Sequence, residues 1–122
     1  MPNPTKIYKQ EQQDITVIYL EGEVDLKTAP QFEKLVQAEI DAGRYRIIVS
    51  CEKLSYISSA GLGVFMSFVE EVRESGGDVK IYGMPSNLRN IIVTMGFTKI
   101  FDMVDDLTTA ISRFTTSATE KR

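Results

Sequence analysis

Residues 54–64 read LSYISSAGLGV and connect two segments with different hydrophobic patterns. The run before them, 46–51 (RIIVSC), is rich in β-branched residues and is typical of a strand covered on both faces. After the turn of small residues, apolar side chains recur at helical spacing as far as residue 75. They are Leu62, Phe65, Met66, Val69 and Val72. A strand that passes through a short turn into an amphipathic helix is the repeating unit of α/β domains.

The same change of pattern recurs on both sides of this unit. Further strands are predicted around Ile7 and Tyr8, at 15–20 (ITVIYL), at 78–82 (DVKIY) and over 99–104. Further helices are predicted over 28–42, from Ser86 to Gly96 and from Asp105 to Phe114. This order predicts a single α/β domain with a mixed, mostly parallel sheet of four to five strands and about four helices.

Turn-forming residues flank the predicted helices. We expect Thr28 to cap helix 28–42, which Gly43 ends. An Asp is expected to cap the last helix. Ser58 or Ser59 is expected to cap the helix that follows the small-residue turn, because either hydroxyl can accept a free amide of its first turn.

Length and composition exclude several classes of function. With 122 residues and a hydrophobic content of 43%, the chain fits one domain with a core of its own. It contains no His, which excludes His-based catalytic triads and His metal ligands. Cys51 is its one Cys, so no internal disulfide forms. The net charge of −3 argues against a nucleic-acid partner.

The sequence carries no recognisable membrane or secretory segment. No apolar run approaches the roughly 20 residues of a membrane span, and the first residues, MPNPTKIYKQEQQ, contain no hydrophobic signal region. We therefore expect a cytoplasmic protein without membrane insertion. Residues 1–5 contain two prolines and 115–122 (TTSATEKR) lack large apolar residues, so both ends are predicted to be flexible termini around a domain over 6–114.

The turn at 54–64 allows several interpretations of its serines and glycines. In the simplest, Ser58 or Ser59 is a helix cap and the glycines serve packing. A phosphate-binding loop would need a GxxxxGK[ST] motif and a nucleophilic serine would need a His, and the chain has neither. Alternatively, one hydroxyl accepts a phosphoryl group, because a helix N-terminus stabilises negative charge.

Two motifs together resemble the STAS-domain family, and specifically the bacterial anti-sigma factor antagonists. One is the turn YISSAGLGVF at 56–65, and the other is the Gly-Glu-x-Asp loop within 20–29, LEGEVDLKTA. The resemblance extends over about residues 7–114 and includes the order of strands and helices. The chain departs from the family pattern at Ser58, where many members have Asp, and at Ala60, where the family has a second serine.

The resemblance implies a regulatory binding protein that is not an enzyme and uses no cofactor or metal. Its unphosphorylated form would bind an anti-sigma factor that is also a serine kinase, and would thereby release a sigma factor. The kinase would phosphorylate Ser59, with Ser58 as the second choice, and a serine phosphatase would reverse this step. The docking surface would comprise Glu23, Asp25, Tyr56, Ser58, Ser59, Gly61 and Gly63.

Two other functions are compatible with the same residues. A STAS adaptor, or a structural subunit of a stress-signalling or transporter complex, would use this surface without phosphorylation. A weak nucleotide-binding protein or hydrolase would use the Gly-rich turn, although the chain has neither a His nor a phosphate-loop Lys to support it.

Overall fold

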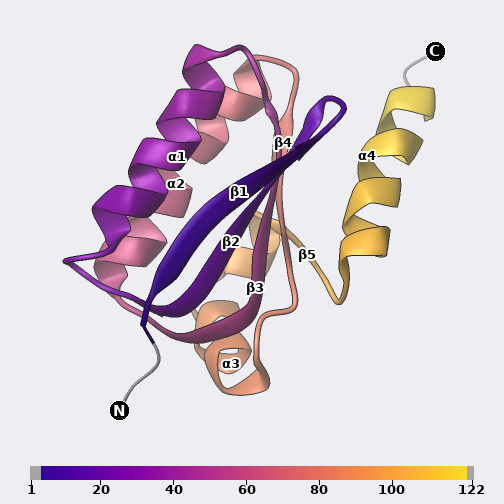
Figure 1. The fold of residues 1–122 in the computed structure, drawn as a ribbon. Helices are drawn as coiled ribbons and strands as arrows, with labels where there is room; N and C mark the ends of the chain where they lie inside the picture. Colours follow the sequence, from indigo (N-terminus) through magenta and orange to yellow (C-terminus); the bar gives the residue numbers. More distant parts are fainter. Residues whose placement is uncertain (1–3, 121–122) are drawn as a thin grey trace.

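Strands and helices alternate along the chain in the predicted order (Figure 1). The computed structural model describes residues 4–120, with side chains as far as Phe114. The strands are β1 (Lys6–Gln12), β2 (Ile15–Val24), β3 (Arg46–Ile57), β4 (Asp78–Tyr82) and β5 (Asp102–Val104). The helices are α1 (Ala29–Asp41), α2 (Ser59–Glu74), α3 (Ser86–Thr94) and α4 (Leu107–Glu120), with a 3-10 turn, η1 (Phe97–Lys99), before β5.

All strands of the described chain form one sheet in the order β1-β2-β3-β4-β5. β1 pairs antiparallel with β2, whereas β2 to β5 are parallel, which confirms the predicted mixed, mostly parallel sheet. α1 and α2 cover one face and α4 covers the other (Figure 1). α3 lies at the end where β2, β3 and β4 finish, which we call the carboxyl end of the sheet; the opposite end is its amino end.

Alternation of side chains along the strands divides the apolar residues between two cores. On the α1 and α2 side, Ile18 and its neighbours pack against Phe32 and Phe65, whose rings meet edge to face with centroids 4.9 Å apart. On the α4 side, a smaller core contains Val17 and Phe114. The larger core seats α2 firmly on the sheet, so the N-terminus of α2 has a fixed position relative to the strands.

Three strand boundaries differ from the prediction. β2 continues to Val24 and β3 to Ile57, beyond the predicted ends at 20 and 51. Polar residues interrupt the apolar pattern there, but the β2–β3 ladder crosses them through two register shifts. The last strand is shorter than the predicted 99–104, because Lys99 belongs to η1 and pairing begins only at Asp102.

Of the residues predicted to begin or end α1 and α4, two are confirmed and one is wrong. The Asp106 carboxylate accepts the Thr109 amide at 2.8 Å, so an Asp caps α4. Gly43 follows α1 with φ of +75°, as a helix-ending glycine does. Thr28 occupies the cap position of α1 but caps no helix amide, because its hydroxyl oxygen accepts the Asp25 amide at 2.9 Å instead.

The predicted flexible ends, 1–5 and 115–122, include residues 1–3 and 121–122, which lie outside the described part of the chain. The backbone of α4 continues past Phe114 to Glu120. Thr5, at the inner edge of the predicted N-terminal tail, makes hydrogen bonds to Glu23, and flexibility of the remaining end residues stays a prediction. Between residues 4 and 120, no helix combines the length and the apolar character that crossing a bilayer requires.

Candidate functional site

The connection from β3 to α2 is a sharp turn at Ser58. Its backbone is extended, with φ of −89° and ψ of 174°, and α2 begins at the next residue. The Ser58 amide donates to the Val24 carbonyl at 2.8 Å, which ties the turn to the end of β2. The Ser58 hydroxyl accepts the Gly61 amide at 3.4 Å. Ser58 is therefore the cap of α2, as one of the two predicted alternatives has it.

The two serines of the turn lie in different environments. Ser58 is half-buried and its hydroxyl is occupied by the cap interaction. Ser59 is exposed at the first position of α2, and among the described residues no hydrogen bond engages its hydroxyl. A visiting protein can therefore reach the Ser59 oxygen without opening the fold, whereas reaching the Ser58 oxygen would disrupt the cap.

The two glycines of the turn also differ. A Cβ at Gly61 would lie 2.7 Å from Cγ1 of Ile57 and 2.8 Å from Cγ1 of Val24, so this buried position has room only for glycine. Gly63 is exposed, and apart from its chain neighbours and the nearby backbone of α2, no described atom lies within 4 Å of the place where its Cβ would be. Internal packing thus explains why residue 61 is a glycine, but it does not explain the glycine at residue 63. Gly61 lies beneath the surface of the turn and does not line it.

The loop after β2 meets the turn at the carboxyl end of the sheet. Glu23 pairs in register with Tyr56, and Val24 with Ile57, so the two sequence motifs are neighbours in space. Glu23 and Tyr56 are both exposed, and Tyr56 retains 48% of its accessible surface. This register brings Glu23 and Tyr56 to the strand ends that lead to Ser59, and a docking surface shared by the three residues stays a prediction.

Asp25 has a structural task in this loop. One of its carboxylate oxygens accepts the backbone amides of Lys27, at 2.9 Å, and of Thr28, at 3.1 Å. These hydrogen bonds, that from Thr28 foremost, lower the pKa of Asp25 below its ordinary value. Asp25 is therefore ionised at neutral pH and shapes the entry into α1, in addition to any contact with a partner.

Leu26 is a surface residue that the sequence analysis missed. Its side chain retains 80% of its accessible surface, the largest fraction among the exposed large hydrophobic residues of the described chain. A leucine between Asp25 and Lys27, in a loop that follows a strand, was the available signal. Because an exposed leucine gains from burial by a partner, we count Leu26 as a candidate contact residue.

The remaining reactive groups of the described chain do not suggest a second site. Burial raises the pKa of the Cys51 thiol to about 12, which leaves it protonated and unreactive. Within the described residues, no three His, Cys, Asp or Glu side chains are grouped to hold a metal ion. Of the two serine hydroxyls of the turn, that of Ser59 is the exposed one.

Comparisons with known proteins agree with the fold, and the family match includes the residues of both motifs. The model of the STAS domain matches residues 6–110. The anti-sigma-B factor antagonist of Bacillus subtilis (strain 168) is 33% identical over 96 residues, which cover 78% of this chain and 85% of that protein. Among solved structures, an anti-sigma factor antagonist from Mycobacterium paratuberculosis superimposes with a TM-score of 0.78 at 22% identity, covering 93% of this chain and 96% of that one.

A further similar structure is the anti-sigma factor antagonist SpoIIAA, solved in an unphosphorylated form and, as a Bacillus cell fate determinant, in a phosphorylated form. The unphosphorylated form has a TM-score of 0.72 at 23% identity and covers 91% of this chain and 97% of that one. The family match spans most of the sequence, and the fold agrees with it. The chain therefore belongs to the STAS domain family.

Proposed function

We propose that this protein is an anti-sigma factor antagonist whose binding is switched off by phosphorylation of Ser59. In its unphosphorylated form it binds an anti-sigma factor that is also a serine kinase, and so releases a sigma factor in the cytoplasm. A serine phosphatase restores the binding form. The relative from Bacillus subtilis is named as an anti-sigma-B factor antagonist, and the similar protein SpoIIAA exists in both phosphorylation states, which supports this proposal.

The observation that carries the proposal is the exposed, unengaged hydroxyl of Ser59 at the N-terminus of α2. The free amides of the first helical turn stabilise a phosphate there, so the domain can accept the group and stay folded. Ser58 is the weaker candidate, because its half-buried hydroxyl caps the helix.

The proposed docking patch consists of Glu23, Leu26, Tyr56, Ser59 and Gly63, all exposed at the carboxyl end of the sheet. Asp25, Ser58 and Gly61 hold this surface in shape from within. Leu26 and Tyr56 supply the apolar contact area that a protein interface needs at its centre.

Phosphorylation acts on the partner through charge. A phosphoserine carries roughly −1.5 to −2 charges at neutral pH. If the partner covers Ser59, that charge must be desolvated without a matching cation, which costs several kcal/mol. Since each 1.4 kcal/mol corresponds to about a tenfold change in affinity, one phosphate lowers the affinity for the partner by orders of magnitude.

Labelling with candidate kinases tests the proposal. The protein is incubated with ATP and each anti-sigma factor kinase, and the peptide 54–73 is analysed by mass spectrometry. We expect one phosphate on Ser59, loss of the label in Ser59→Ala and its persistence in Ser58→Ala. A label on Ser58, or on a residue outside the peptide, would contradict the choice of acceptor. An unmodified chain that copurifies with a partner other than a kinase would instead favour a STAS adaptor.

A further inference from the structure

Thr5 holds the backbone of Glu23 at both of its polar groups. Its hydroxyl donates to the Glu23 carbonyl at 2.9 Å and accepts the Glu23 amide at 3.3 Å. The β1–β2 ladder ends before these residues, at the pair Lys6 and Glu21. Beyond the ladder, backbone groups need other partners, and the Thr5 side chain supplies them for Glu23.

The segment that carries Thr5 lies directly against Gly22. A Cβ at Gly22 would lie 3.1 Å from Cα of Thr5 and 3.3 Å from the carbonyl oxygen of Pro4. The backbone of Gly22 also has φ of +90°, a conformation that residues with side chains rarely adopt. The backbone shape therefore favours glycine here, and the missing side chain lets residues 4–5 approach the end of β2 closely.

The end of β2, which Thr5 holds, leads directly to the docking patch. The Glu23 carbonyl also accepts the Thr28 hydroxyl, so two threonines from distant parts of the chain fix one peptide group. The next carbonyl, that of Val24, accepts the Ser58 amide. A short series of hydrogen bonds thus connects Thr5 with the turn that presents Ser59.

We infer that Thr5 is a positioning residue for partner recognition: by clamping the Glu23 backbone, it orients the exposed side chains of Glu23 and Leu26 for the anti-sigma factor. This inference rests on the proposed function. A threonine suits this position, because its single hydroxyl can donate one hydrogen bond to the Glu23 carbonyl and accept another from the Glu23 amide.

Isosteric substitution tests the clamp. Thr5→Val keeps the shape of the side chain and removes both hydrogen bonds, whereas Thr5→Ser keeps the hydroxyl. With the kinase identified by labelling as the probe, we expect Thr5→Val to weaken affinity about tenfold. We expect Thr5→Ser to bind within about twofold of the wild type, and the Glu23 amide to exchange its hydrogen faster in Thr5→Val alone.

A double-mutant cycle separates positioning from direct contact. If Thr5 acts through the loop, Thr5→Val costs less affinity in a Leu26→Ala background than in the wild type, since the contact it orients is already lost. Equal affinity of Thr5→Val and the wild type would overturn the inference, and so would full additivity with Leu26→Ala. Failure of the wild type to bind any anti-sigma factor kinase would overturn the proposed function itself.

Discussion

The amino and carboxyl ends of the sheet differ in how their charges are paired. At the amino end, the buried carboxylate of Glu39 lies 2.8 Å from Nζ of Lys9 and 3.3 Å from Nε of Arg44, and it accepts the Thr16 hydroxyl. Burial opposes ionisation of Glu39, but the hydrogen bonds and the two cations outweigh it, so its pKa lies below the ordinary value. These groups satisfy one another and leave little for a partner to bind.

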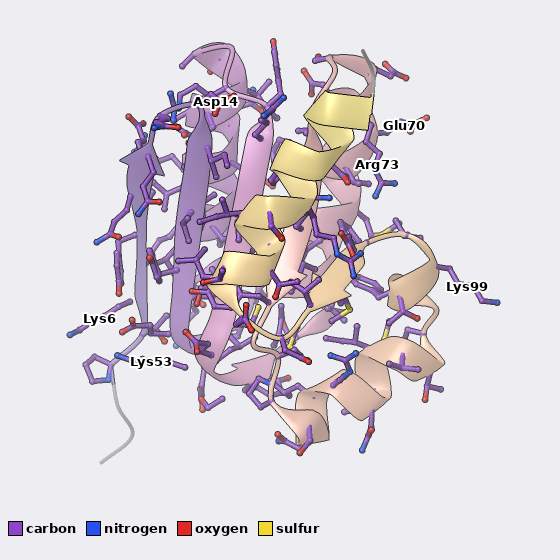
Figure 2. All side chains as sticks on the ribbon, turned by 90° about the vertical axis from the view of Figure 1, so that its right-hand side faces the viewer. Lys6, Asp14, Lys53, Glu70, Arg73 and Lys99 are labelled. Carbon is purple, nitrogen blue, oxygen red and sulfur yellow. The ribbon has the colours of Figure 1, made fainter. Side chains whose placement is uncertain are left out.

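At the carboxyl end, the ion pairs among the described residues are long. Lys53 and Glu21 are 4.0 Å apart, as are Arg89 and Asp105. Figure 2 shows Lys53 at this end of the sheet and Asp14 at the other. The carboxyl end also presents exposed apolar side chains, and it presents Gly63, whose lack of a side chain is not explained by packing within the domain. One end of the sheet therefore stabilises the domain, while the other remains available for binding.

The largest effect on stability is expected at Glu39. Glu39→Gln leaves Lys9 and Arg44 without their buried counter-charge, and we expect the free energy of unfolding to fall by about 3 kcal/mol. Urea denaturation measures this, and Glu33→Gln on the exposed side of α1 is the matched control. Affinity for the partner should stay unchanged in both variants. A loss of affinity in Glu39→Gln would show that the amino end of the sheet influences partner binding at the carboxyl end.

A smaller loss is expected at the packed glycine of the carboxyl end. Gly61→Ala forces a methyl group against Ile57 and Val24, and such overpacking costs about 2 kcal/mol. The midpoint of urea unfolding reports the change. An unchanged midpoint would mean that Ile57 and Val24 can move aside.

The neighbouring glycine is expected to behave in the opposite way. Gly63→Ala adds a methyl group in open space on a helix, which should raise the free energy of unfolding by up to about 1 kcal/mol. If the partner approaches the helix at this point, the same methyl group weakens binding about tenfold. Gain of stability together with wild-type affinity would remove Gly63 from the docking patch.

The smallest effect is expected from pH. The chain contains no His, and the Cys51 thiol titrates only near 12, so stability should be nearly constant between about pH 6 and pH 8. Because the pKa values of Asp25, Glu39 and Asp106 are lowered in the folded protein, their carboxylates stabilise it at pH values above the ordinary 3.8 of Asp and 4.5 of Glu. This stabilisation is lost as pH falls through the folded-state values. Urea titrations at several pH values would contradict this if stability changed steeply near neutrality.

Local patterns predicted the order of the elements and the position of Ser59, because both depend on residues close together in the sequence. They failed where distant segments decide the outcome. The extension of β2 through Glu21 and Glu23 depends on pairing with β3, and the different roles of Gly61 and Gly63 depend on Val24. The clamp of Thr5 on Glu23 joins residues 18 positions apart, and no periodic pattern reports such a contact.

The most direct test of the phosphorylation switch is the affinity of the anti-sigma factor kinase for three forms of the protein, measured by titration calorimetry. The forms are the wild type, the chain phosphorylated on Ser59, and Ser59→Asp, each shown by circular dichroism to be folded. We predict that both charged forms bind at least about a hundredfold more weakly than the wild type, which corresponds to about 2.8 kcal/mol. Equal affinity of all three forms would contradict the account.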